Sequence, residues 1–99
     1  ALTCFEKALA ADPEYTPALM NKGSALASLG RTDEAIESYN GVLQKRPDFA
    51  DAWFHKGRIL LEAGRPKVSI LCFEKALEYS PNFDAARELL AQARTRGAE

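Results

Sequence analysis

The sequence predicts an all-α protein, a solenoid of antiparallel helix pairs, from three features of its 99 residues. Similar residues recur every 34 positions along the chain. Within each period, apolar residues recur every three or four positions, which is typical of an amphipathic helix. Glycine and proline fall at the ends of these stripes, where helices commonly stop. Together these features predict six helices and no strand.

The repeat is marked most clearly by three prolines, Pro13, Pro47 and Pro81, which lie 34 residues apart. Residues 4–9 and residues 72–77, two periods apart, also share the sequence CFEKAL. A fixed period of this length is the signature of a repeat protein, in which each unit stacks on its neighbours to bury a continuous core.

Each period divides into two helices. In the first full period we expect the first helix to end at Gly30, because glycine readily adopts the left-handed conformation of a helix C-terminus. Thr32 is the expected N-cap of the second helix, which stops before Pro47 because a proline ring cannot continue a helix. In the next period Gly64 has the role of Gly30, and Pro66 suits a first helical position.

The chain therefore divides into an incomplete repeat, two complete repeats and a final helix. The final helix carries polar residues where earlier copies are apolar, and the end of an array needs such a polar outer face. Because the chain begins inside an expected helix, we expect it to be a segment of a longer array. The segments are residues 1–12 (second helix of an incomplete repeat), 13–46 and 47–80 (complete repeats) and 81–99 (a capping helix).

These residues resemble the tetratricopeptide repeat, whose pattern is W-x2-L-G-x2-Y, A-x3-F and P over 34 residues. The first full period has Leu19-x2-Lys22-Gly23-x2-Leu26, Ala35-x3-Tyr39 and Pro47, and the second has Trp53-x2-Lys56-Gly57-x2-Leu60, Ser69-x3-Phe73 and Pro81. Two lysines replace the leucine of the pattern, and we expect their alkyl stems to pack while the ammonium groups reach solvent. The resemblance implies a right-handed superhelix whose concave groove is lined by the first helices of successive repeats.

The resemblance also implies which residues face the groove and would contact a partner. We expect Phe54 and Arg58, one helical turn apart, to contribute most to binding. The mixture of apolar, amide and basic side chains suits an extended peptide or a helix, and a merely solvated face is the alternative. The expected peptide-binding residues are Met20, Asn21, Ser24, Phe54, His55, Arg58, Leu61 and Leu89.

Two other interpretations of these positions are less well supported. Some relatives bind the C-terminal carboxylate of chaperones through a clamp of Lys, Asn and Arg, but Met20, Ser24 and Leu89 occupy those places here, so we do not expect chaperone tails to bind. Trp53 occupies a packing position of the repeat pattern, and we interpret it as structural rather than as a ligand platform. Tyr39 and Phe73 are likewise expected between the helices.

The sequence carries no recognisable catalytic, cofactor or metal site, so we expect a protein that is not an enzyme. His55 is the single histidine, and no cysteine is near it in the repeat register, which leaves no metal-ligand set and no nucleophile–histidine pair. No glycine-rich phosphate-binding motif is present. Cys4 and Cys72 lie two repeats apart, too far for a disulfide, and we expect reduced, buried thiols.

Charge and hydropathy limit the classes of partner. Thirteen basic and fourteen acidic side chains nearly cancel, which removes the basic footprint expected of a nucleic-acid-binding protein. No apolar run is long enough to span a bilayer. We expect a protein or peptide partner and a cytoplasmic location, although the sequence holds no signal that assigns a compartment.

The main hypothesis is therefore an interaction scaffold that holds a peptide or a helix in the concave groove. The alternative is a structural spacer or a self-association segment of a longer array. Leu2, Phe5 and Leu9 would lose the helix on which such residues normally pack, so we expect the N-terminal helix to pair with another molecule or to fray. Exposed apolar residues at this end are what the alternative requires.

Overall fold

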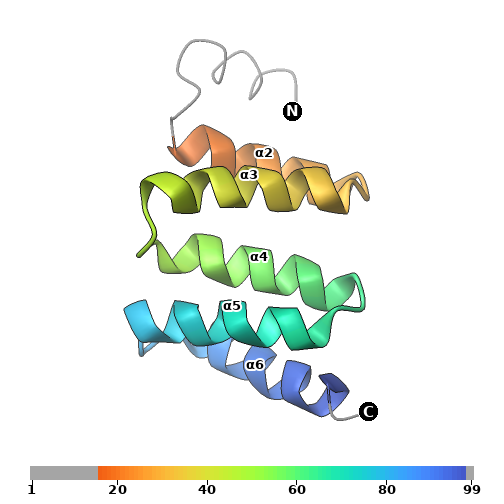
Figure 1. Cartoon of the computed structure of the whole chain (residues 1–99), viewed down its shortest axis with the longest axis vertical. Coiled ribbons are helices and arrows are strands. Elements are labelled where there is room, and N and C mark those ends of the chain that lie inside the picture. The colour runs from red at the N-terminus through yellow and green to blue at the C-terminus, as the bar shows by residue number, and fades with distance from the viewer. Residues whose placement is uncertain (1–15, 98–99) are drawn as a thin grey trace. The chain divides into compact units, whose positions relative to one another are not determined.

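The computed structural model describes residues 16–97, and these residues form helices only. The helix expected over residues 1–12 lies outside the described residues, so five of the six predicted helices are observed (Figure 1). The all-α prediction is confirmed for this part of the chain. The helices are α2 (Thr16–Ser28), α3 (Thr32–Lys45), α4 (Ala50–Glu62), α5 (Pro66–Tyr79) and α6 (Asp84–Gly97).

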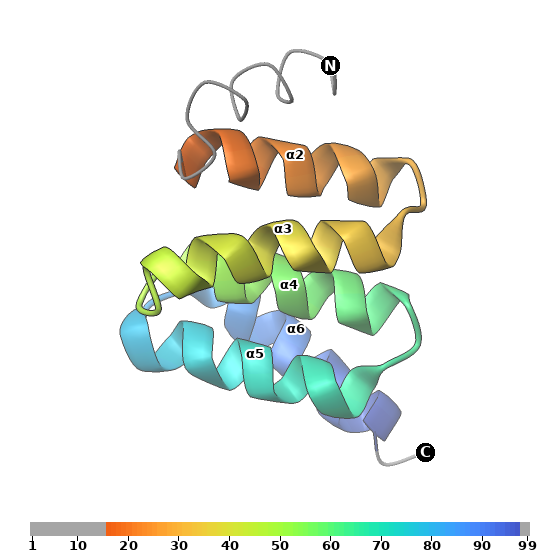
Figure 2. The same ribbon diagram turned by 45° about the horizontal axis from the view of Figure 1, so that its top comes forward.

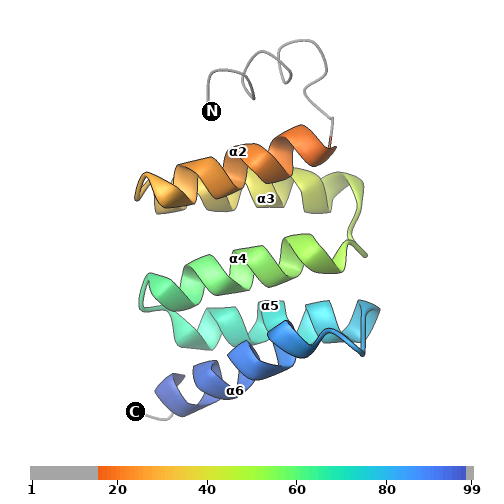
Figure 3. The same cartoon turned by 180° about the vertical axis from the view of Figure 1, so that it is seen from behind.

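The chain divides into two compact units at the junction of Pro47 and Asp48. In the first unit α2 and α3 lie antiparallel and pack against each other (Figure 2). In the second unit α4 and α5 form a similar antiparallel pair, and α6 packs mainly against α5 (Figure 3). The predicted helix pairs of the two complete repeats are therefore present.

Both helix pairs have the same turn. Gly30 and Gly64 have φ values of 79° and 81°, the left-handed conformation that glycine adopts without steric penalty. In the first turn the Arg31 amide donates to the Leu26 carbonyl at 2.9 Å, and the Arg65 amide makes the equivalent bond to Leu60 at 2.9 Å. These bonds satisfy carbonyl groups that the helix end would leave unpaired, and they confirm the predicted role of both glycines.

The start of α3 differs from the expectation. Thr32 is its first helical residue, and Arg31 occupies the N-cap position without a side-chain hydrogen bond to the backbone. The Arg31 side chain forms an ion pair with Glu34 instead. The prediction that Thr32 caps this helix is therefore wrong by one position, whereas Pro66 begins α5 as predicted.

The core of each pair is built around one aromatic ring that faces a glycine. A Cβ atom placed on Gly23 would lie 2.7 Å from Cζ of Tyr39, and one on Gly57 would lie 2.9 Å from Cε1 of Phe73. Tyr39 and Phe73 are fully buried, as predicted. Only a residue without a side chain permits this close approach of the two helices.

Candidate functional site

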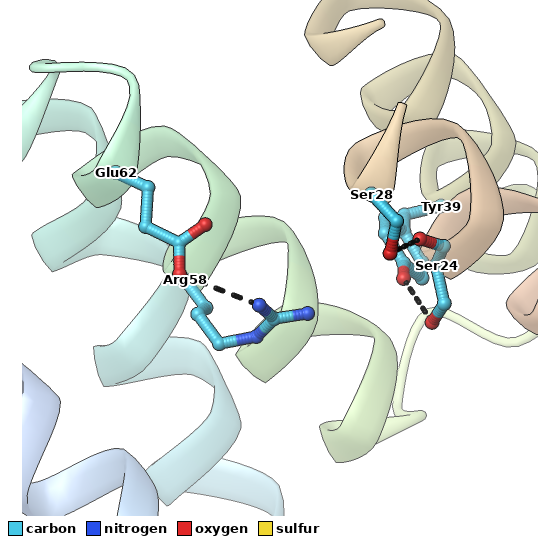
Figure 4. Close-up of polar contacts among 5 residues, drawn as sticks. All are labelled: Ser24, Ser28, Tyr39, Arg58 and Glu62. Atoms are coloured by element: carbon cyan, nitrogen blue, oxygen red, sulfur yellow. Dashed lines mark hydrogen bonds and ion pairs between the residues drawn. The ribbon is translucent and has the colours of Figure 1, made fainter. Parts of the chain in front are cut away.

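The face of α2 that was predicted to bind a partner is polar. Asn21 and Ser24 are exposed, and Met20 is partly buried. The hydroxyl groups of Ser24 and Tyr39 are 3.0 Å apart, and the hydroxyl of Ser28 donates to the Ser24 carbonyl at 3.1 Å (Figure 4). Ser24 is thus engaged in holding α2 to α3, which leaves the Asn21 amide as the exposed polar group of this face.

Phe54 of α4 has a packing role in addition to its predicted place on the binding face. Its ring centroid is 4.7 Å from that of Phe83 and 6.1 Å from that of Phe73, and the ring of His55 meets it edge-on at 5.2 Å. Such tilted and edge-on arrangements are favourable for aromatic rings. Phe54 is therefore only partly available to a partner, and removing its ring would weaken the second unit.

Leu61 corrects one of the predicted positions. It was expected on the binding face of α4, but it is 4% exposed and lies in a cluster with Phe73, Leu90 and Ala93. The helical register placed Leu61 toward solvent, and α6 covers it with the side chains of Leu90 and Ala93. Leu89, also a predicted site residue, packs partly buried against the same cluster.

Arg58 is the basic group of the α4 face. Its Nη1 is 3.5 Å from Oε1 of Glu62, one turn along the helix (Figure 4). The side chains of Arg58 and Glu62 are 33% and 65% exposed, and an ion pair this open to water contributes little to stability. The guanidinium group is therefore held beside the surface while most of its donors stay available to a ligand.

His55 lies next to Arg58 on α4 and is about half buried. Burial and, to a smaller extent, the positive charge of Arg58 lower the pKa of His55 below its ordinary value of 6.5, while Asp51 acts in the opposite direction. The imidazole is therefore neutral at physiological pH, and the α4 face presents one cation rather than two.

Sequence reasoning did not identify two exposed apolar residues on α5, Val68 and Leu71. The signal was present in the comparison of periods, since glutamates stand 34 residues earlier at positions 34 and 37. Phe83 was likewise not identified as a contact of Phe54, although an aromatic residue recurs at positions 15, 49 and 83.

The chemistry of the remaining groups is that of a folded surface. Among residues 16–97 no cluster of three or more His, Cys, Asp or Glu side chains could hold a metal ion. None of the helices seen in this range is both long and apolar enough to cross a membrane. Burial raises the pKa of the Cys72 thiol, with a smaller opposing influence of Lys56, so Cys72 is a reduced, unreactive thiol. Cys4 lies outside the described residues.

Solved structures with similar folds come from several proteins, at low sequence identity. The first tetratricopeptide domain of Spaghetti (RPAP3), bound to the HSP90 peptide SRMEEVD, matches 99% of this chain and 78% of its own with a TM-score of 0.93 and 21% identity. The TPR2B domain of yeast Sti1 in a complex with a pHsp70 peptide matches 97% of this chain and 82% of its own, with a TM-score of 0.88 and 20% identity.

A third similar structure, YrrB, is described as a tetratricopeptide protein with an unusual peptide-binding site. It matches 89% of this chain with a TM-score of 0.86 and 25% identity, and this chain spans 45% of its length. A comparison with curated proteins finds no match. The family model for the tetratricopeptide repeat matches residues 1–48 and 29–82. The chain therefore belongs to the tetratricopeptide repeat family.

Proposed function

We propose that this chain is a non-catalytic interaction scaffold, which binds a peptide or a helix of another protein through the exposed faces of its first helices. The residues that we assign to this role are Asn21 and Met20 on α2 and Arg58 and His55 on α4. Their binding role is an expectation from the repeat register, and the local geometry of each helix supports it.

The observation that carries the proposal is the environment of Arg58. Its guanidinium group is two-thirds shielded, beside the half-buried Phe54 and His55, and its only printed partner is the weakly bound Glu62. A carboxylate or backbone carbonyl of a ligand can replace Glu62 without leaving a buried charge unpaired. Arginine beside an aromatic ring is a frequent source of binding energy in protein interfaces.

The similar structures support the kind of partner but not its identity. The Spaghetti and Sti1 domains are described as bound to HSP90 and pHsp70 peptides, and YrrB as having a peptide-binding site. We therefore propose a peptide partner for this chain. Chaperone tails are not proposed, because Met20, Ser24 and Leu89 replace the basic and amide residues of the clamp.

The test is a peptide array probed with the labelled 99-residue chain, followed by fluorescence anisotropy on the peptides that bind. Arg58→Ala should weaken binding by about fivefold to a hundredfold, the range for losing a charge-assisted hydrogen bond. Arg94→Ala is the matched control, because Arg94 is an exposed arginine on α6 with a similarly weak ion pair at 3.7 Å. It should leave binding unchanged. Phe54→Ala is avoided, because it would also disturb the core.

The array should include the HSP90 peptide SRMEEVD, which we expect not to bind. If no peptide binds the wild-type chain, or if Arg58→Ala and Arg94→Ala behave alike, the proposal is wrong. Sedimentation of the wild-type chain then distinguishes a self-associating segment, whose mass rises with concentration, from a monomeric spacer. The self-association surface expected over Leu2, Phe5 and Leu9 lies outside the described residues.

A further inference from the structure

A second surface of the second unit has the properties of a binding groove. It is a depression of about 400 Å³ along the junction of α4 and α5. None of its residues belongs to the peptide-binding faces assigned above, so the two proposals are independent of each other. The groove is lined by Trp53, Lys56, Val68, Leu71, Cys72, Glu74, Lys75 and Glu78.

The groove is apolar where it is open to solvent. Leu71 is 63% exposed and Val68 is 48% exposed, and they lie one turn apart on α5. Cys72 is buried beneath them, and the ring of Trp53 forms part of the opposite wall. Single exposed apolar residues are common on protein surfaces, but here they gather in one concave site.

The first helix pair shows that the fold does not require this composition. Its equivalent depression, between α2 and α3, has a volume of about 350 Å³ and is lined by residues that include Glu34, Glu37 and Ser38. In the 34-residue register these three polar positions correspond to Val68, Leu71 and Cys72. The same site is therefore acidic and solvated in one pair and apolar in the next.

The charges at the rim indicate the polarity of a ligand. Lys75 pairs with Glu78 at 3.4 Å, and Glu74 pairs with Arg94 at 3.7 Å. Lys56 lines the groove with its Nζ 5.5 Å from the centre of the Trp53 ring, and no ion pair of Lys56 is found within the described residues. A ligand with an acidic group would thus meet one cation that is not already neutralised by a carboxylate.

We propose that the α4–α5 groove binds an amphipathic segment of a partner protein, with apolar side chains seated on Val68, Leu71 and Trp53 and a carboxylate directed at Lys56. Two antiparallel helices leave a channel in which the apolar stripe of a third helix fits. The apolar contacts supply most of the affinity, and the carboxylate sets the orientation.

Trp53 provides a direct readout because it is the only tryptophan of the chain. The probes are synthetic peptides of about 15 residues without tryptophan or tyrosine, with leucines at i, i+4 and i+7 and one flanking glutamate, or glutamine in the matched set. We expect a saturable shift of Trp53 emission. The glutamate peptides should bind about two to five times more tightly than the glutamine peptides, and Lys56→Gln should abolish this difference.

The decisive variant is Val68→Glu/Leu71→Glu, which places in α5 the residues that α3 already carries at the equivalent positions and so preserves the fold. It should raise the Kd at least about tenfold. Ala85→Glu/Ala91→Glu adds the same charge to exposed positions of α6 and serves as the control, with an unchanged Kd. Circular dichroism verifies that both variants are folded.

Three results would overturn the proposal. The first is the absence of a saturable Trp53 shift with every peptide, and the second is equal binding by the two double variants. The third is a wild-type dimer that Val68→Glu/Leu71→Glu dissociates, because the occupant would then be a second copy of this chain. Arg58→Ala should leave peptide binding in this groove unchanged, so failure here is distinguishable from failure of the proposed function.

Discussion

The α2–α3 pair and the α4–α5 pair share a backbone plan but present different surfaces. Both pairs turn at a left-handed glycine with the same hydrogen bonds, and both place an aromatic ring directly on a helical glycine. The common features are those that permit two helices to approach closely. They depend on backbone conformation and volume, which leave little choice of residue.

The differences lie in what surrounds the aromatic ring. Tyr39 reaches Ser24 with its hydroxyl group at 3.0 Å, whereas Phe73 has no hydroxyl and packs with Phe54 and Leu61. The first pair therefore closes with a polar contact at its surface, and the second with an apolar cluster that extends to α6. A repeat can keep one scaffold while its exposed positions change from solvated to apolar.

The largest expected effect concerns the contact that the pairs share. Gly57→Ala should destabilise the chain by about 1–3 kcal/mol, because the added Cβ would lie 2.9 Å from Phe73 and 3.0 Å from Cys72 Cβ. Gly41→Ala is the control in α3, where the nearest atom is 3.8 Å away. It should stabilise the chain by about 0.5–1 kcal/mol through helix propensity. Urea unfolding midpoints provide the measurement, and equal shifts for both variants would contradict the shared-contact interpretation.

A smaller effect is expected from the contact that distinguishes the pairs. Tyr39→Phe gives the first pair the ring of the second, and should cost about 1 kcal/mol or less because the hydroxyl bond lies near the surface. Ser24→Ala should cost a similar amount. The double variant should cost less than the sum of the two if the bond is the cause. Additive costs in thermal or urea unfolding would show that the hydroxyl contact carries no coupling energy.

The smallest effect is a pH dependence that only the second pair has, since Asn21 stands where His55 recurs. The lowered pKa of His55 means that the unfolded chain binds more protons than the folded chain. Stability should therefore fall as pH decreases through the ordinary value of 6.5, until the folded-state pKa is passed. His55→Asn should flatten the unfolding free energy between about pH 7.5 and pH 5.5. An unchanged pH profile in this variant would count against the assigned cause.

The binding residues were less predictable than the fold. The repeat register placed Asn21 and Arg58 at exposed positions, and the structure agrees with their exposure. It could not show that α6 covers Leu61 or that Phe83 packs on Phe54, because these contacts join residues that are distant in the chain. The groove at Val68 and Leu71 was detectable only by comparing each period with the one before it.

The sequence by itself determined the helix boundaries to within a residue or two, the two glycine turns and the aromatic–glycine contacts, because each depends on local backbone conformation or on residues at a fixed period. Tertiary structure decided which inward positions remain accessible. Accessibility depends on the volume and direction of side chains from a third helix, and Leu90 and Ala93 of α6 bury Leu61 while no helix of the second unit covers Leu71. Solvent exposure is a property of neighbours in space, and periodicity describes only neighbours along the chain.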